Sequence, residues 1–238
     1  DMLEVFKEQG YKTALVGKNH AHVKAKDFDY CEEYFHWGKN RRDTQEDKDF
    51  AFFLNNKARG QYLEATPFPS DAQNPVKIVT KALAWAKEQK DSAFFMWVSM
   101  PEPHNPYQIS EPYYSMFSPE KIPATLTSRK DLSKKGDKYT ILAELEDLPR
   151  LRGNYLGMLR LIDDQTKRLI DGFQAVGLYE NTIFVILSDH GDYCGEYGLI
   201  RKGAGVPECL TRIPMIWAGC GIHPQSAPMD AHVSIADI

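Results

Sequence analysis

The sequence predicts an α/β fold with a mostly parallel central sheet flanked by helices, and three observations point to that class. Helical patterns alternate with short apolar runs along the chain, which is the order of βαβ units. Some of these runs are apolar throughout, as in strands that a sheet buries on both faces. Each run ends in polar residues, and parallel sheets bind ligands at the carboxyl ends of their strands.

The first unit is a short helix followed by a strand. Residues 2–9 carry apolar side chains on one side of a helix. Residues 11–16, YKTALV, predict a strand whose exit carries Lys18 and His20.

The second unit repeats this order. Residues 76–90 have apolar positions at helical spacing, and residues 93–100, AFFMWVSM, predict a fully buried strand. That strand leads into the proline-rich stretch PEPHNP, which contains His104.

The third unit is the most regular. Residues 154–176 follow the i, i+3, i+4, i+7 rule, and the strand TIFVILS after them leads into Asp189 and His190. A last strand is expected at about 213–218. The exits of the three units should therefore meet at one edge of the sheet.

Two segments do not fit the repeat. Residues 38–75 and 107–153 are polar and proline-bearing, and we expect them to be long excursions from a single domain that spans residues 1–238. Both chain ends stop in mid-pattern, so we expect an internal fragment whose fold is incomplete at both ends.

Composition excludes several classes of protein. The chain has 29 Lys and Arg against 33 Asp and Glu, a net charge of −4 that argues against a broad nucleic-acid surface. No apolar run approaches the ~20 residues of a membrane-spanning helix. The four cysteines have no zinc-ligand spacing, and neither compartment nor oligomeric state can be read from them.

The residues at the strand exits suit the binding of a cation and an anion. Asp189 beside His190 suits a divalent cation, although a turn with a capping Asp and a surface His is the alternative. Lys202 would bind a tetrahedral oxyanion as a point charge, or it is simply a solvated lysine. Prolines around His104 would hold its imidazole as a proton donor, or it is a surface His in a proline-rich loop.

Several segments resemble the sulfatase family of the alkaline-phosphatase-like superfamily. GYKTALVGKNH (10–20) is similar to the family's Gly-Tyr-x-Thr strand that ends in Gly-Lys-x-His. PEPHNPY (101–107) resembles its Pro-His-x-Pro loop, and SDHGDYCGEYGLIRKG (188–203) resembles its Ser-Asp-His/Asn-Gly loop with the following Lys-Gly. Further matches in the family's order extend the resemblance over essentially the whole chain: 28–38, 211–217 and 233–238.

The resemblance implies a cation site and an anion site. Asp189 and His190 would be two metal ligands of a divalent cation, usually Ca²⁺ in sulfatases. Lys18 and Lys202 would contact the sulfate oxygens, where their charges offset the negative charge of the ester.

The resemblance also implies two catalytic histidines and a nucleophile. His20 would orient the nucleophile, and His104 would contact the substrate and protonate the leaving alcohol. The family's nucleophile is formylglycine, made from Cys or Ser in a Cys/Ser-x-Pro/Ala-x-Arg motif that none of the four cysteines matches. It and the family's first strand, with two more acidic ligands, normally lie upstream of the position where this chain begins. Asn19 and Tyr197 stand where Trp and His are common.

The expected activity is hydrolysis of sulfate esters, with a small sulfated sugar or aryl sulfate as substrate. The first alternative is a phosphate or phosphonate monoester hydrolase on the same scaffold. The second is a catalytically inactive relative that binds anionic or sulfated sugars. The isolated chain is expected to be inactive, and the family expectation for its location is export, periplasmic or lysosomal.

Overall fold

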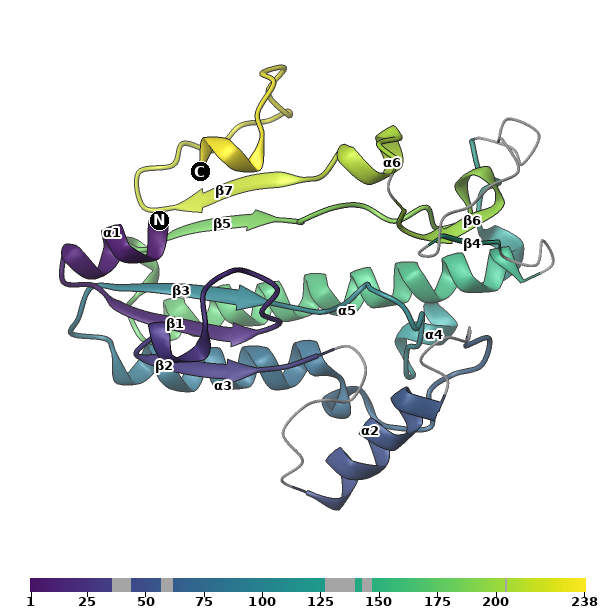
Figure 1. The fold of residues 1–238 in the computed structure, drawn as a ribbon, viewed down its shortest axis with the longest axis horizontal. Coiled ribbons are helices and arrows are strands. Elements are labelled where there is room, and N and C mark those ends of the chain that lie inside the picture. Colours follow the sequence, from purple (N-terminus) through teal and green to yellow (C-terminus); the bar gives the residue numbers. More distant parts are fainter. Residues whose placement is uncertain (36–43, 57–61, 127–139, 143–146, 204) are drawn as a thin grey trace.

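The computed structural model describes residues 1–35, 44–56, 62–126, 140–142, 147–203 and 205–238. The helices of this part are α1 (Met2–Glu8), α2 (Gln45–Asn56), α3 (Asn74–Glu88), α4 (Tyr113–Met116), α5 (Leu148–Ala175) and α6 (Glu208–Thr211) (Figure 1). Its strands are β1 (Lys12–Gly17), β2 (Tyr30–Glu33), β3 (Phe94–Ser99), β4 (Thr140–Leu142), β5 (Ile183–Leu187), β6 (Leu199–Arg201) and β7 (Met215–Gly219).

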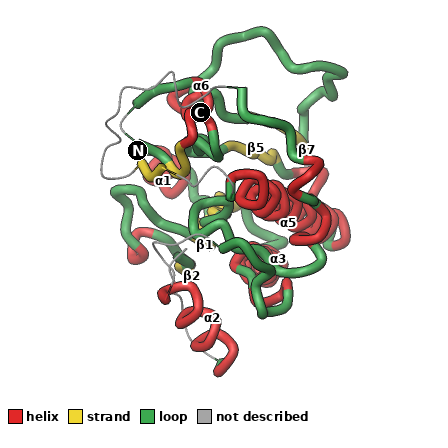
Figure 2. The backbone as a smooth tube through the Cα atoms, turned by 90° about the vertical axis from the view of Figure 1, so that its right-hand side faces the viewer, coloured by secondary structure: helices red, strands yellow, loops and turns green. Residues whose placement is uncertain are grey.

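The centre of the fold is β1, which pairs in parallel with β2 on one edge and β3 on the other. Its side chains alternate between two cores. Val16 packs with residues of α3 and α5, whereas Leu15 packs with Leu3 of α1 and with Phe28. Figure 2 shows α3 and α5 side by side on one side of β1. This parallel sheet with its helices confirms the predicted fold class.

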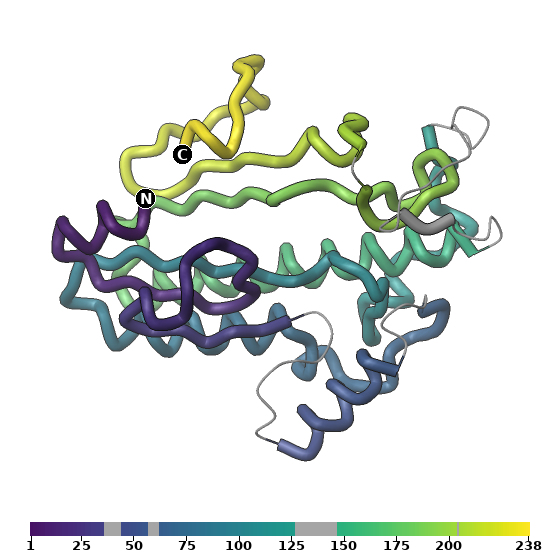
Figure 3. The backbone as a smooth tube through the Cα atoms, in the orientation of Figure 1, coloured from purple at the N-terminus to yellow at the C-terminus, as the bar shows by residue number. Residues whose placement is uncertain are grey.

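The strands β5 and β7 form a second, two-stranded sheet. β5 runs in the same direction as β3, and β7 is antiparallel to β5 (Figures 1 and 3). Within the described residues, β3 pairs only with β1, and β5 pairs only with β7. The prediction that residues 93–100 are buried on both faces is therefore wrong for this chain, since β3 is mostly half-buried and Trp97 is 38% exposed.

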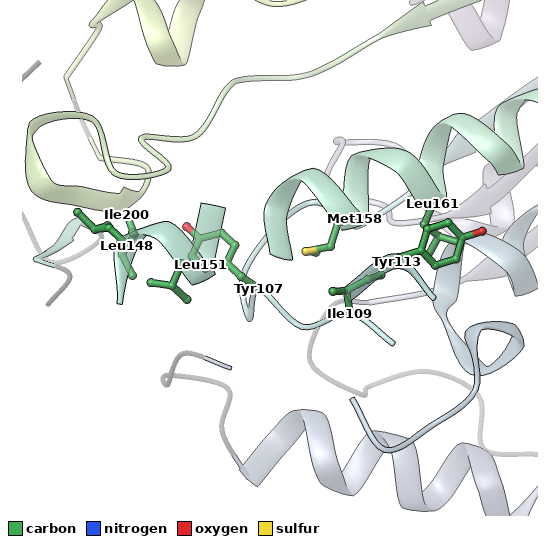
Figure 4. Packing of buried hydrophobic residues seen from close by; sticks show 8 residues of the cluster. All are labelled: Tyr107, Ile109, Tyr113, Leu148, Leu151, Met158, Leu161 and Ile200. Carbon is green, nitrogen blue, oxygen red and sulfur yellow. The ribbon is translucent and has the colours of Figure 1, made fainter. Parts of the chain in front are cut away.

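The helix α5 begins earlier than its apolar pattern suggested. Its 28 residues start at Leu148, inside the predicted excursion 107–153, and Pro149 lies in the first turn. Proline is favoured there because the first N–H groups of a helix have no partner within the helix. The N-terminal half of α5 shares a third core with the segment after β3 and with β6: Tyr107, Ile109, Tyr113, Leu148, Leu151, Met158, Leu161 and Ile200 (Figure 4).

The excursions are described only in part. Residues 38–43 and 57–61 of the first, and 127–139 and 143–146 of the second, lie outside the described residues. The second excursion begins in the core just named, because Tyr107 and Ile109 are buried.

Candidate active site

The exit of β1 is built around a glycine. Gly17 has φ +125°, and a Cβ there would lie 1.9 Å from the carbonyl oxygen of Ser99, so the close approach of β1 to β3 requires glycine. The next amide, that of Lys18, donates to the same oxygen at 2.8 Å. Lys18 itself is buried, 8% exposed.

Other charges surround the Lys18 ammonium. Burial lowers its pKa, Asp189 opposes that effect, and Lys202 adds to it. His20 is exposed at the rim of the same group, and partial burial together with Lys18 and Lys202 lowers the pKa of its imidazole. Residues from the exits of β1, β5 and β6 therefore act on one another electrostatically.

His104 follows β3 and lies near the same two lysines, Lys18 and Lys202. Its Nδ1 lies 2.7 Å from the carbonyl oxygen of Asn105, so Nδ1–H donates there and Nε2 carries the lone pair. Burial lowers the pKa of His104 to about 4, and Lys18 and Lys202 contribute to the shift. The imidazole is therefore neutral near pH 7.

Glu102 is a buried carboxyl in the same loop, which the sequence patterns did not single out. It is 9% exposed, and its Oε1 accepts from Asn74 Nδ2 at the start of α3, at 3.2 Å. Its Oε2 has no hydrogen-bond partner among the described residues. Burial raises the pKa of Glu102 to about 7, although Asn74 and Lys18 act in the opposite direction.

Asp189 and His190 lie at the open side of the group. Asp189 Oδ2 is 3.6 Å from His190 Nε2, and the two side chains are 73% and 30% exposed. His190 Nδ1 is 2.7 Å from the carbonyl oxygen of Gly191, and Nε2 contacts the ammonium of Lys202. No three His, Cys, Asp or Glu side chains in the described ranges gather as a metal site does. The pair has donors of the right type for a divalent cation but supplies only part of a coordination shell.

Asp192 has a structural role, because one of its carboxylate oxygens accepts three hydrogen bonds. Its Oδ1 accepts from the hydroxyl of Tyr107 at 2.9 Å and from the amides of Cys194 and Arg201 at 2.8 and 3.1 Å. Burial raises its pKa to about 6. Asp192 thus ties the loop after β5 to the loop after β3 and to β6.

A hollow of about 570 Å³ opens beside these groups. Asp189, His190 and Lys202 line its polar side. Leu210, Ile213 and residues 233–236 line the remainder. An anion could approach the lysine from this side.

The structure brings together the residues that the sequence predicted as a site, while their chemical roles stay predictions. They are Lys18, His20, His104, Asp189, His190 and Lys202. Sequence reasoning missed Glu102 and the bond between Tyr107 and Asp192. The only signal for Glu102 was a carboxylate between two prolines, and nothing in the sequence relates Tyr107 to a residue 85 positions away.

Known proteins resemble this chain over most of its length. The family model described as Sulfatase matches residues 1–238. The protein named "Uncharacterized sulfatase YidJ" of Escherichia coli (strain K12) is 25% identical, over 89% of this chain and 45% of its own length. The fold is similar to that of the phosphonate monoester hydrolase SpPMH from Silicibacter pomeroyi, with a TM-score of 0.71, 18% identity, and coverage of 94% of this chain and 53% of that one.

A further similar structure is that of BT4656 in complex with its substrate D-glucosamine-2-N,6-O-disulfate. Its TM-score is 0.62 at 17% identity, with coverage of 90% of this chain and 54% of that one. The chain spans about half the length of the relatives it matches. In the described part of the chain, no helix has the length and apolar character needed to cross a bilayer.

Proposed function

Because the chain belongs to the sulfatase family, we propose that the protein of which it forms part hydrolyses sulfate esters. The observation that carries this proposal is the meeting of Lys18, Lys202 and His104 at the ends of separate strands. A sulfate monoester presents three oxygens that share a negative charge. Groups of positive charge, held in place before the substrate arrives, stabilise such an anion as its S–O bond breaks.

The two lysines would bind the sulfate oxygens. Lys18 is buried, and burial already restricts its side chain, so its ammonium loses less freedom when an anion binds than an exposed lysine would. Lys202 reaches the site from β6 and lines the hollow. An anion between the two ammonium groups would offset their repulsion, which already lowers the pKa of Lys18.

His104 would protonate the leaving alcohol through Nε2. With its Nδ1–H donated to Asn105, Nε2 is the nitrogen that would carry the proton for the alcohol. Because its pKa is about 4 when no anion is present, the imidazole must gain its proton after an anion has entered. A bound sulfate ester beside Lys18 and Lys202 would raise the pKa of His104. His20, at the rim, would orient the nucleophile and assist the later release of sulfate.

The proposed enzyme needs two groups that this chain does not itself supply, a divalent cation and formylglycine. Asp189 and His190 would hold a divalent cation, which would supply positive charge to the sulfate and to the nucleophile. Ca²⁺ is the proposed ion, and the imidazole donor makes Mn²⁺ the ion to compare with it. Formylglycine on an upstream segment would supply the attacking oxygen.

The full-length protein tests this proposal with an aryl sulfate such as p-nitrophenyl sulfate. His104→Ala should lower kcat by about 10²–10⁴-fold, since general-acid catalysis is typically of that size. The control is His22→Ala, because His22 is exposed and pairs with Asp1 away from the site. Equal activity of the two variants would overturn the role of His104.

A phosphate or phosphonate monoester hydrolase remains the second candidate, and the fold similarity to a phosphonate monoester hydrolase favours it. Mass spectrometry of the segment upstream of Asp1 separates the candidates. Formylglycine there supports the sulfatase. An unmodified Ser or Thr together with faster turnover of a phosphonate ester supports the second candidate, and the lack of any nucleophile would leave an inactive protein that binds anionic sugars.

The isolated chain should be inactive, because it has no residue in the family's nucleophile motif. Turnover of p-nitrophenyl sulfate by purified 1–238 that His104→Ala abolishes would contradict this expectation.

The substrate class proposed is a small sulfated sugar or an aryl sulfate. One structural neighbour holds a disulfated glucosamine as its substrate, which supports the sugar. Comparing kcat/KM for that sugar and for p-nitrophenyl sulfate distinguishes the two.

A further inference from the structure

One hydroxyl group joins the two loops that carry His104 and Lys202. Tyr107 lies three residues after His104, and its Oη donates to Asp192 at 2.9 and 3.0 Å from the two carboxylate oxygens. The same Oη accepts from the backbone N–H of Arg201 at 2.7 Å. Arg201 directly precedes Lys202, and Asp192 lies two residues after His190.

The Tyr107 end of this link is rigid. Tyr107 is 2% exposed, and its ring packs edge to face on that of Tyr155, with centroids 6.2 Å apart. Its carbonyl oxygen accepts from Asn154 Nδ2 of α5 at 3.1 Å. The neighbouring Gln108 exchanges two hydrogen bonds with Gln73 at the start of α3, at 2.7 and 3.1 Å. The hydroxyl is thus held at a defined place relative to α3 and α5.

The Lys202 end of the link has an unfavourable backbone conformation. Arg201 has φ +69° and Cys194 has φ +43°, a region that side chains other than glycine seldom adopt. The amides of both residues donate to Asp192 Oδ1, and that of Arg201 also donates to Tyr107. These acceptors, together with the amide of Tyr193 that donates to the Arg201 carbonyl oxygen at 2.8 Å, hold the end of β6 from which Lys202 follows.

We propose that Tyr107 is a positioning residue whose hydroxyl keeps Lys202 in register with His104. Without it, Arg201 would lose its closer acceptor, and the end of β6 before Lys202 could relax to an ordinary backbone conformation. Lys202 would then move relative to a loop that α3 and α5 still hold. The part of this proposal that concerns anion binding rests on the proposed function.

The chain offers a matched control. Tyr113 belongs to the same buried core as Tyr107, and its hydroxyl also donates to a carboxylate, Asp164, at 3.1 Å. Asp164 lies on α5 and makes an ion pair with Arg160. Tyr107→Phe and Tyr113→Phe therefore each remove one hydroxyl from one core and one bond to an aspartate, but only the first touches the end of β6 before Lys202.

The first measurement is the binding of inorganic sulfate to the full-length protein by calorimetry. Tyr107→Phe should weaken the Kd by roughly tenfold to a hundredfold with unchanged stoichiometry, the size expected for hydrogen bonds near charged groups. A merely structural role would reduce the stoichiometry and leave the Kd of the folded fraction unchanged. Tyr113→Phe should leave the Kd within about twofold. Equal Kd values for the two variants would overturn the proposal.

The second measurement does not depend on sulfate binding. Amide hydrogen exchange in the peptide that spans 199–203 should speed up at least tenfold in Tyr107→Phe and not in Tyr113→Phe. If the wild type binds no sulfate while this difference appears, the proposed function fails and the link between the loops stands. Unchanged exchange at 199–203 would refute the link itself. Should Tyr107→Phe not fold, Asp192→Asn provides the same comparison, because it weakens the acceptor shared by Cys194 and Arg201.

Discussion

The strands β1 and β5 both end at the candidate site, yet they differ in how they are covered. The last five residues of β1 are buried, and a parallel strand pairs with it on each edge. β5 is half-buried with exposed ends, and within the described residues it pairs only with β7. The residues at the two exits differ in the same way, since Lys18 is 8% exposed and the Asp189 side chain is 73% exposed.

This difference shows that one half of the candidate site, around Lys18, is buried within the chain, whereas the other half, with the proposed cation ligands Asp189 and His190, is open. The backbone of Lys18 is fixed by the hydrogen bond from its amide to Ser99, next to the close approach at Gly17. Asp189 and His190 supply part of a coordination shell. The resemblance assigns the missing acidic ligands to an upstream strand, and we expect that strand to cover β5 in the full-length protein.

The largest expected effect comes from truncating a leucine in each strand. Leu15→Ala should cost about 3 kcal/mol in the free energy of unfolding, because Leu15 is 0% exposed and packs with Leu3 and Phe28. Leu187→Ala in β5, where Leu187 is 39% exposed, should cost about 1 kcal/mol.

Urea unfolding of 1–238 and of the full-length protein gives both values. A cost for Leu187→Ala that rises in the longer protein would show that the upstream part covers β5. Equal costs of the two variants in 1–238 would contradict the comparison.

The free energy of unfolding should depend on pH through Glu102, which lies in the buried half of the candidate site. Its folded pKa of about 7 lies above the ordinary value of 4.5, so the folded state is favoured below pH 4.5 and loses that advantage as the pH rises through 7. The loss should be about 3 kcal/mol, and Glu102→Gln should remove it.

Unfolding free energies at two pH values check this expectation. At about pH 8, where wild-type Glu102 is ionised, Glu102→Gln should be the more stable protein. At about pH 4.5 both side chains are neutral in the folded state, so the two proteins should have nearly equal stability there. A wild-type advantage at the higher pH would contradict the burial of an unpaired carboxylate oxygen.

The open half should determine which cation is preferred. His190→Asn replaces an imidazole nitrogen with an amide oxygen, and oxygen ligands favour Ca²⁺ over Mn²⁺. The ratio of the two affinities in the full-length protein should shift toward Ca²⁺ by about tenfold, measured by calorimetry. Asn19→Ala, at the β1 exit, is the control. An unchanged ratio in His190→Asn would mean that His190 does not bind the cation.

The smallest effect compares a threonine at the start of each strand. Thr13 Oγ1 donates to Asp29 Oδ2 at 3.0 Å and accepts from the Asp29 amide at 3.2 Å, so Thr13→Val should cost about 1 kcal/mol. Thr182 Oγ1 makes one bond, to the carbonyl oxygen of Leu178, and Thr182→Val should cost about half as much. Thermal unfolding measures both, and the reverse order would contradict the view that β1 is the better anchored strand.

Much of the candidate site could be predicted because strands that run in the same direction end on the same side of the fold, even when they are distant in sequence. Lys18, His104 and Asp189 each follow an apolar run, and those runs became β1, β3 and β5. The start of α5 was misplaced because Pro149 resembles a loop residue in sequence, although it also suits the first turn of a helix. The burial of β3 was overestimated because an apolar run cannot show whether a neighbouring strand is present.

The sequence by itself determined the alternation of helices and strands, the family, and the types of residue at the strand ends. Periodicity and motif spacing are local properties, and they survive without knowledge of the packing. Only the tertiary structure decided that Glu102 is buried against Asn74 and that Tyr107 holds Asp192 and Arg201. Those bonds join residues 28, 85 and 94 positions apart, and their formation depends on how α3, α5 and β6 pack around the loop after β3.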